Sequence, residues 1–235
     1  MSRPDARESA SPVLEARRLH LSFGPNEVLT ECDLAVHAGD RIALMGPSGS
    51  GKSTLLHCLG GILRPDAGEV LFDGRRVDDQ PDAVRSRCRL ERMGVVFQFG
   101  DLVPELTLEE NVMLPLLLMG VRRRTARAAA RQVLGELDIA ALGEHRASTV
   151  SGGEVQRAAI ARALVHEPVV VLADEPTGSL DTVNAEVVLD LLVRQTAERG
   201  TALVVVTHDH LVASQLDRLA LISDGRVSER EAVHP

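Results

Sequence analysis

The sequence of 235 residues predicts an α/β fold in which an all-helical insert interrupts a buried parallel sheet. Continuous apolar runs at residues 169–172 and 202–206 are typical of strands that are covered on both faces of such a sheet. A strand expected at 41–45 runs directly into a Gly-rich segment and then into a helical pattern at 52–59. Between residues 109 and 164 the strand signals disappear, which indicates helices alone.

The first part of the chain reads mainly as strands. Loose alternation of apolar residues predicts a strand at 14–21, and shorter apolar runs predict strands at 34–36 and 41–45. Residues 68–77 form a hairpin candidate, because Asp73-Gly74 supplies the turn between two apolar stretches. A short buried strand is expected at 94–97.

The second part of the chain reads mainly as helices, with two further apolar strands. Helices are expected at 109–119, 125–138 and 152–164, and a further helix at 184–199 separates the two apolar strands. Asp224-Gly225 predicts a final hairpin. We therefore expect a disordered tail at 1–12 and one domain at 13–235, with a core at 13–98 and 166–235 and a helical subdomain at about 99–165.

Composition excludes several classes of protein. The net charge of −8 argues against a general nucleic-acid binder, and the three isolated cysteines argue against a zinc site or a disulfide framework. The N-terminus lacks the apolar run that a secretory signal requires. The longest apolar stretch, 112–121, is too short to span a membrane. One basic run, Arg122–Arg124 followed by Arg127 and Arg131, is either a solvated helix face or a contact for lipid headgroups or an acidic partner.

A phosphate-binding pattern follows the strand at 41–45. Lys52, the only lysine of the chain, closes a Gly-x-x-x-x-Gly-Lys-Ser pattern. Its glycines let backbone N–H groups converge on one anion, and its lysine is compact enough to reach the phosphates inside the curl, where a guanidinium would be too broad. The alternative is a Gly/Ser turn that matches by chance. The predicted nucleotide-binding residues are Gly46, Pro47, Ser48, Gly49, Ser50, Gly51, Lys52, Ser53 and Thr54, and Ser53 is also expected to ligate Mg²⁺.

Two carboxylates end the apolar strand near residue 172. Asp174 is the candidate for metal contact, direct or through water, because a strand end beside a phosphate-binding loop is where Mg²⁺ needs an acid. Adjacent residues on a strand point opposite ways, so Glu175 is expected to face elsewhere and to accept a proton from attacking water. The alternative is a solvated turn.

A second Ser-Gly-Gly turn opens the helix expected at 152–164. Free N–H groups at Ser151, Gly152 and Gly153 would make another anion site, although Ser151 is also a good helix N-cap. Two phosphate-binding turns in one chain suggest that one ATP is held between two copies.

Together these segments resemble the nucleotide-binding subunit of an ABC transporter over nearly the whole chain. Residues 46–54 are similar to the Walker A motif, 169–175 to Walker B, 151–164 to the signature (with Val150 where Leu is usual) and 179–181 to the D-loop. Gln98 resembles the Q-loop glutamine and His208 the switch histidine, while Phe23 stands where the family places an aromatic residue against adenine. The resemblance implies a P-loop NTPase (RecA-like) core with an antiparallel β subdomain and an all-helical insert, the ABC ATPase fold.

The resemblance also implies roles and partners. Glu175, Gln98, His208 and Lys52 would act in ATP hydrolysis, and Gln98 would join Ser53 and Asp174 at Mg²⁺. Residues 97–120 and 172–181 resemble the branch of lipoprotein-releasing, macrolide-export, cell-division and peptide-resistance cassettes, although that branch usually has Asn at Ser179. A head-to-tail homodimer would then drive a separate integral-membrane permease from the cytoplasmic face of the membrane. A cell-division ATPase that regulates a wall hydrolase is the alternative. The apolar loop 99–108, with Leu102, Val103 and Leu106, is either the permease site or ordinary packing.

Overall fold

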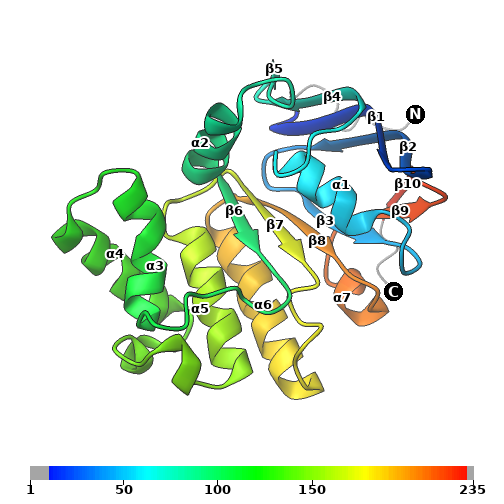
Figure 1. Cartoon of the computed structure of the whole chain (residues 1–235). Coiled ribbons are helices and arrows are strands. Elements are labelled where there is room, and N and C mark those ends of the chain that lie inside the picture. Colours follow the sequence, from blue (N-terminus) through cyan, green and yellow to red (C-terminus); the bar gives the residue numbers. More distant parts are fainter. Residues whose placement is uncertain (1–10, 232–235) are drawn as a thin grey trace, which may run out of the picture.

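The computed structural model describes residues 11–231 and contains two β-sheets and a group of helices, which confirms the α/β prediction (Figure 1). Only residues 11 and 12 of the predicted tail lie within this part. A six-stranded sheet has the order β10-β9-β3-β8-β7-β6, and a four-stranded antiparallel sheet has the order β2-β1-β4-β5. The strands are β1 (Leu14–Phe23), β2 (Asn26–Val36), β3 (Arg41–Met45), β4 (Ala67–Phe72), β5 (Arg75–Arg76), β6 (Met93–Val96), β7 (Val170–Asp174), β8 (Ala202–Val206), β9 (Arg218–Ser223) and β10 (Arg226–Glu231).

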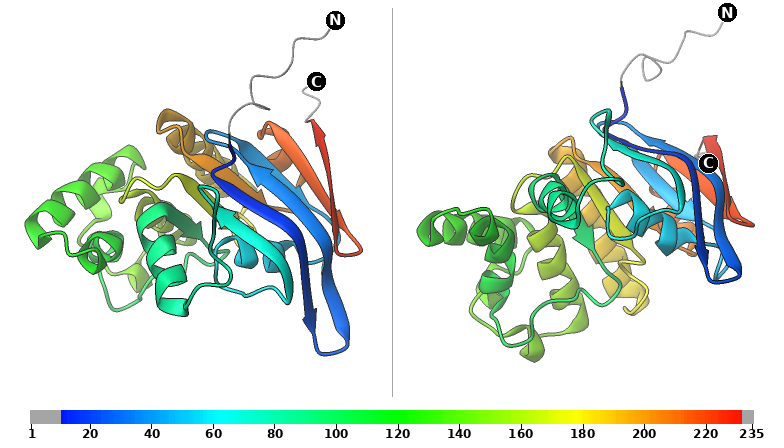
Figure 2. Two further views of the ribbon diagram at one scale, coloured as in Figure 1. Left: turned by 90° about the horizontal axis from the view of Figure 1, so that it is seen from above. Right: turned by 45° about the horizontal axis from the view of Figure 1, so that its top comes forward.

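Helices cover one face of the six-stranded sheet, and the antiparallel sheet and α1 lie on the other side (Figures 1 and 2). The helices of the described residues are α1 (Lys52–Leu59), α2 (Asp82–Arg92), α3 (Leu108–Leu118), α4 (Arg123–Glu136), α5 (Gly152–Leu164), α6 (Thr182–Glu198) and α7 (His210–Ser214). Two short 3₁₀ turns lie at Ala140–Leu142 and Ala147–Thr149.

Strands β3, β8, β7 and β6 are parallel neighbours, and both of their faces are buried. In β8 every residue is buried, and alternate side chains enter two different apolar clusters. Val204 packs towards α1 and the antiparallel sheet, whereas Leu203 and Val205 pack towards the helices. Covering both faces explains why these strands read as unbroken apolar runs rather than as an alternation.

The helical part is held together by ion pairs as well as by apolar packing. The carboxylate of Glu109 in α3 is buried; it forms an ion pair with the Nε of Arg127 (2.7 Å) and accepts from the Nε of Arg131 (2.5 Å), both in α4. Arg123 pairs with Glu110 at 3.3 Å. Much of the basic run therefore forms ion pairs with carboxylates of the same chain. This favours the prediction of a solvated helix face over that of a contact for lipid headgroups.

Several elements differ from the sequence predictions. Helices α2 and α7 were not predicted, and β2 begins at Asn26 instead of near residue 34, whereas β9 and β10 form the hairpin predicted at Asp224-Gly225. Helix α2 lacks a signal because none of its residues is buried and most of them are polar. Helix α7 has only five residues.

Within residues 11–231, none of the helices combines the length and the apolar character that a membrane crossing requires.

Candidate functional site

Most of the predicted site residues lie where the parallel strands end. The Gly-rich loop follows β3, Gln98 follows β6, Asp174 and Glu175 close β7, and His208 follows β8. Because parallel strands present their carboxyl ends at one edge of a sheet, the fold brings these segments together (Figure 1). That edge is where open α/β sheets bind ligands.

The phosphate-binding loop requires glycine at two positions. Gly46 has φ of 155°, and a Cβ there would overlap the carbonyl oxygen of Ile222. Gly51, with φ of 101°, is the N-cap of α1, and a Cβ would lie 2.8 Å from the carbonyl oxygen of Val28. The loop tip, Pro47–Gly49, is exposed, so a ligand can reach it.

Lys52 turns its side chain back over this loop. Its Nζ donates to the carbonyl oxygens of Gly46 (2.9 Å) and Pro47 (2.8 Å), and the residue is buried. The hydroxyl of Ser50 is also buried and has no hydrogen-bond partner within the described part of the chain. The α1 N-terminus, which lacks a side-chain cap, completes a set of donors suited to phosphate.

Ser53 and Asp174 meet directly, with the Ser53 Oγ donating to the Asp174 Oδ1 at 2.9 Å. Burial raises the pKa of Asp174, and the hydrogen bond from Ser53 opposes that shift. Among residues 11–231 there is no group of three or more His, Cys, Asp or Glu side chains that could hold a metal. One hydroxyl and one carboxylate suit Mg²⁺, which takes few protein ligands and shares the rest with phosphates and water.

Glu175 leaves the strand in an unusual backbone conformation. Its φ is 44°, in the left-handed region, and its N–H donates to the carbonyl of Val206. The expectation that strand alternation would turn Glu175 away is therefore wrong in its cause, since β7 ends at Asp174 and the turn comes from the backbone at Glu175. Non-glycine residues in this region cost about 1 kcal/mol or more and cluster at functional sites.

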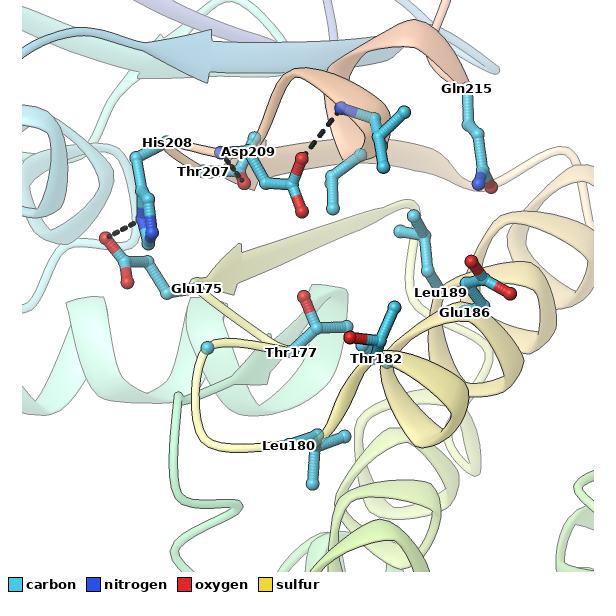
Figure 3. A pocket seen from close by; sticks show the side chains of 14 residues that line it. Glu175, Thr177, Leu180, Thr182, Glu186, Leu189, Thr207, His208, Asp209 and Gln215 are labelled. Atoms are coloured by element: carbon cyan, nitrogen blue, oxygen red, sulfur yellow. Dashed lines mark hydrogen bonds and ion pairs between the residues drawn. The ribbon is translucent and has the colours of Figure 1, made fainter.

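Glu175 faces His208 across the mouth of a cavity of about 180 Å³ (Figure 3). The Nδ1 of His208 lies 3.3 Å from the Glu175 Oε1, and the His208 side chain is 69% exposed. Thr177, Glu186 and Gln215 line the same cavity. The predicted base and the predicted switch histidine are thus brought together beside solvent.

Gln98 lies at the same edge. The Nε2 of Gln98 and the Oε2 of Glu175 both flank Gly178, where a Cβ would be 3.0 and 3.1 Å from them. The Ser179 hydroxyl donates to the Gln98 backbone carbonyl at 3.0 Å. Position 179, where the related branch usually has Asn, therefore joins the D-loop segment to the Q-loop segment.

The second Ser-Gly-Gly turn is not brought to the first. Ser151 caps α5 in a reciprocal capping box with Glu154, and it is exposed. Gly153 packs against Asn184, so the turn lies beside the start of α6. Helices α1 and α5 lie well apart in Figure 1. The residues predicted to share one nucleotide therefore do not share one site within a single chain.

Phe23 ends β1 in the hairpin that β1 forms with β2 and is 54% exposed, so it is not a core residue. The close approach of Val28 to Gly51 places this hairpin beside the Gly-rich loop.

The loop 99–108 differs from its prediction in which of its apolar residues are exposed. Leu102 and Leu106 are only partly exposed, and the exposed large apolar residues are Phe99 (71%) and Val103 (39%).

One further residue at this edge was missed. His57 of α1 lies 3.7 Å from Asp174 through its Nε2. Its position four residues after Ser53, on the same helical face, was the only available signal.

Comparison with known proteins agrees with this geometry. The ABC transporter family profile matches residues 29–178. The lipoprotein-releasing system ATP-binding protein of Legionella pneumophila (strain Paris) is 45% identical over 93% of this chain and 98% of its own length. That of Geobacter metallireducens is 47% identical over 92% of this chain and 98% of its own.

A solved structure extends the agreement to the fold. An ATP-binding cassette, described as a dimer in a post-hydrolysis state bound to ADP and Pi, superimposes with a TM-score of 0.85. It is 34% identical in sequence, and the match covers 94% of this chain and 99% of the other. The chain therefore belongs to the ABC transporter family, as one of its ATP-hydrolysing cassettes.

Proposed function

We propose that this chain is the ATPase subunit of a lipoprotein-releasing transporter, and that two copies hydrolyse ATP beneath a separate membrane permease. The cargo class is supported by relatives at 45% and 47% identity that carry that name. The two-copy site rests on one observation. The Gly-rich loop and the Ser151 turn both suit phosphate, yet they lie apart in the chain.

Each nucleotide would contact two chains. Lys52, Ser53 and Thr54 of one copy would hold the phosphates, and Ser151 and Gly153 of the other copy would close over them. Phe23 would stack on adenine, because its exposed ring lies in the hairpin beside the Gly-rich loop. A head-to-tail arrangement makes two such sites, consistent with the dimeric cassette to which this chain is similar.

Hydrolysis would proceed by in-line attack of water on the γ-phosphorus. Glu175 would accept the proton of the attacking water at its carboxylate while the bond from phosphorus to the leaving ADP oxygen breaks. Lys52 would stabilise the charge that develops on the phosphate oxygens. His208 and Gln98, which both lie beside Glu175, would report the presence of the γ-phosphate.

Ser53 and Asp174 are the residues that would hold Mg²⁺, with Gln98 as a further oxygen ligand. When bound, Mg²⁺ neutralises charge on the β- and γ-phosphates. The direct contact between Ser53 and Asp174 supports this assignment, since both oxygens already point into one space.

The permease would dock beside the loop 99–108 on the cytoplasmic face of the membrane. A cleft of about 370 Å³ lies next to this loop, between α2, β6 and α5, and Leu90, Phe97, Pro115 and Arg162 line it. Phe99 and Val103 add exposed apolar surface nearby. A cleft with apolar walls and a polar rim suits a short permease helix.

The experiment that tests this function is reconstitution in lipid vesicles with the permease that co-purifies with the chain. Mg-ATP is expected to release a lipoprotein from the vesicles, and the Lys52→Ala chain is expected to release none. Hydrolysis of ATP without lipoprotein release would overturn the cargo class while leaving the ATPase assignment intact. Purification without any membrane partner would overturn the role in transport.

A further inference from the structure

His57 carries a polar atom that the fold leaves without a partner. Its Nε2 is buried and forms no hydrogen bond within the described residues, although the side chain as a whole is 29% exposed. The ring lies against Phe97, the residue before Gln98, with centroids 6.3 Å apart. A buried polar atom without a hydrogen-bond partner is costly and uncommon, so its position calls for a reason.

The nearest acid to this atom is Asp174. The Nε2 of His57 lies 3.7 Å from the Asp174 Oδ2, which is beyond hydrogen-bond length, while the other carboxylate oxygen accepts from Ser53 at 2.9 Å. Ser53 and His57 are four residues apart on α1, so they project from one helical face. Two side chains of the same helix therefore address the two oxygens of one carboxylate.

We propose that His57 is a positioning residue for Asp174: its Nε2–H holds the carboxylate when the Ser53 hydroxyl turns to the metal. This inference rests on the proposed role of Ser53 and Asp174 at Mg²⁺. Once Ser53 no longer donates to Asp174, the carboxylate needs another donor, and the His57 Nε2 already lies 3.7 Å from its Oδ2. Removal of a hydrogen-bond donor to a metal-binding carboxylate typically lowers the affinity for the metal by about 10–100-fold.

Three substitutions separate donation from packing. His57→Leu keeps much of the volume and removes the donor. His57→Gln retains an amide N–H at a similar reach, and His57→Asn retains the amide on a shorter side chain. His20→Leu, in the antiparallel sheet, is the matched control for loss of a histidine.

The measurement is binding of a fluorescent ATP analogue to the purified chain while Mg²⁺ is varied, and then in EDTA. His57→Leu and His57→Asn are expected to raise the half-saturating Mg²⁺ concentration by about tenfold. Binding in EDTA should be unchanged in both, because the Gly-rich loop is intact. His57→Gln should restore most of the Mg²⁺ dependence, and His20→Leu should match the unmodified chain.

Two results would overturn the proposal. An unchanged half-saturating Mg²⁺ concentration in His57→Leu and His57→Asn would show that Asp174 needs no help from His57. Equal loss in His57→Gln and His57→Leu would assign the effect to ring packing against Phe97. If the unmodified chain binds the ATP analogue equally well at every Mg²⁺ concentration, the metal site in the proposed function is contradicted instead.

Discussion

Two turns of this molecule open a helix with Gly and Ser, yet they treat anions differently. At the start of α1 the N-cap is Gly51, no side chain caps the helix and its first turn has no acid. At the start of α5 the Ser151 hydroxyl and Glu154 cap each other. Hydrogen bonds from Ser151 lower the pKa of Glu154, so an anionic carboxylate occupies that helix end.

The difference indicates an order of events. The α1 turn offers free N–H groups and a lysine, so it can hold a triphosphate without help from another chain. In the α5 turn the N–H groups of Ser151 and Glu154 already have partners, and Glu154 carries a negative charge, so this turn is a weaker phosphate site than the α1 turn. In the proposed dimer it would bind phosphate when a nucleotide held by another copy is brought to it.

The largest effect is expected at Lys52. Lys52→Ala removes the cation of the α1 turn, and ATP turnover should fall by at least about a hundredfold, with most nucleotide affinity lost. Lys52→Arg should also be badly impaired, because the buried space under the loop limits size. ATPase assays with the permease decide both. Arg124→Ala, which removes an exposed cation from α4, serves as control, and near-normal turnover in Lys52→Arg would contradict the shape argument.

Glu175→Gln should separate binding from chemistry. The amide keeps the volume but cannot take the proton, so hydrolysis should fall by about 10²–10⁴-fold while ATP still binds. Dimers should accumulate with Mg-ATP, because bound nucleotide stabilises the interface. Size-exclusion chromatography measures this. A variant that remains monomeric and hydrolyses ATP normally would place the base elsewhere.

Ser151→Glu tests the α5 turn directly. A second carboxylate there should repel the phosphate presented by the partner, so ATP-dependent dimers and turnover should be lost. Nucleotide binding by the single chain should be unchanged, since its own Gly-rich loop is intact. Binding of a fluorescent ATP analogue at low protein concentration checks this, with the exposed Thr125→Glu as the charge control. Weaker binding in Ser151→Glu alone would mean that both turns serve one nucleotide within a chain.

The smallest effect on the isolated chain is expected from Phe99→Glu and Val103→Glu. Both residues are exposed, so basal ATP binding should be retained, whereas co-purification with the permease and permease-dependent turnover should be lost. Leu102→Glu and Leu106→Glu should do the same, but Leu102 also packs against the helical core and its substitution should lower the melting temperature. Normal assembly in all four variants would move the docking surface elsewhere.

The sequence predicted best where one physical cause dominated. The bounds of α1, α5 and β8 match the expected ranges 52–59, 152–164 and 202–206, because Gly and Ser mark both helix starts and burial on both faces leaves an apolar strand. Helix α2 was missed because none of its residues is buried and most of them are polar.

Parts of the site that depend on long-range contacts could not be predicted. The position of His57 depends on α1 packing beside the end of β7, and the left-handed backbone of Glu175 depends on its hydrogen bond to Val206. The Ser179 link to the Gln98 carbonyl joins residues 81 positions apart. The spacing of residues within a short segment of sequence does not predict such long-range contacts.

The two hydrogen bonds from Lys52 to the loop carbonyls of Gly46 and Pro47 have a consequence for product release. An ammonium that already has two internal acceptors loses them when phosphate arrives, so the affinity for nucleotide reflects an exchange of partners. When ADP departs, the same carbonyls would accept from the ammonium again, and no bare cation would remain buried. In the proposed cycle, the loss of nucleotide contacts would therefore be offset in part by the two hydrogen bonds that Lys52 regains within the loop.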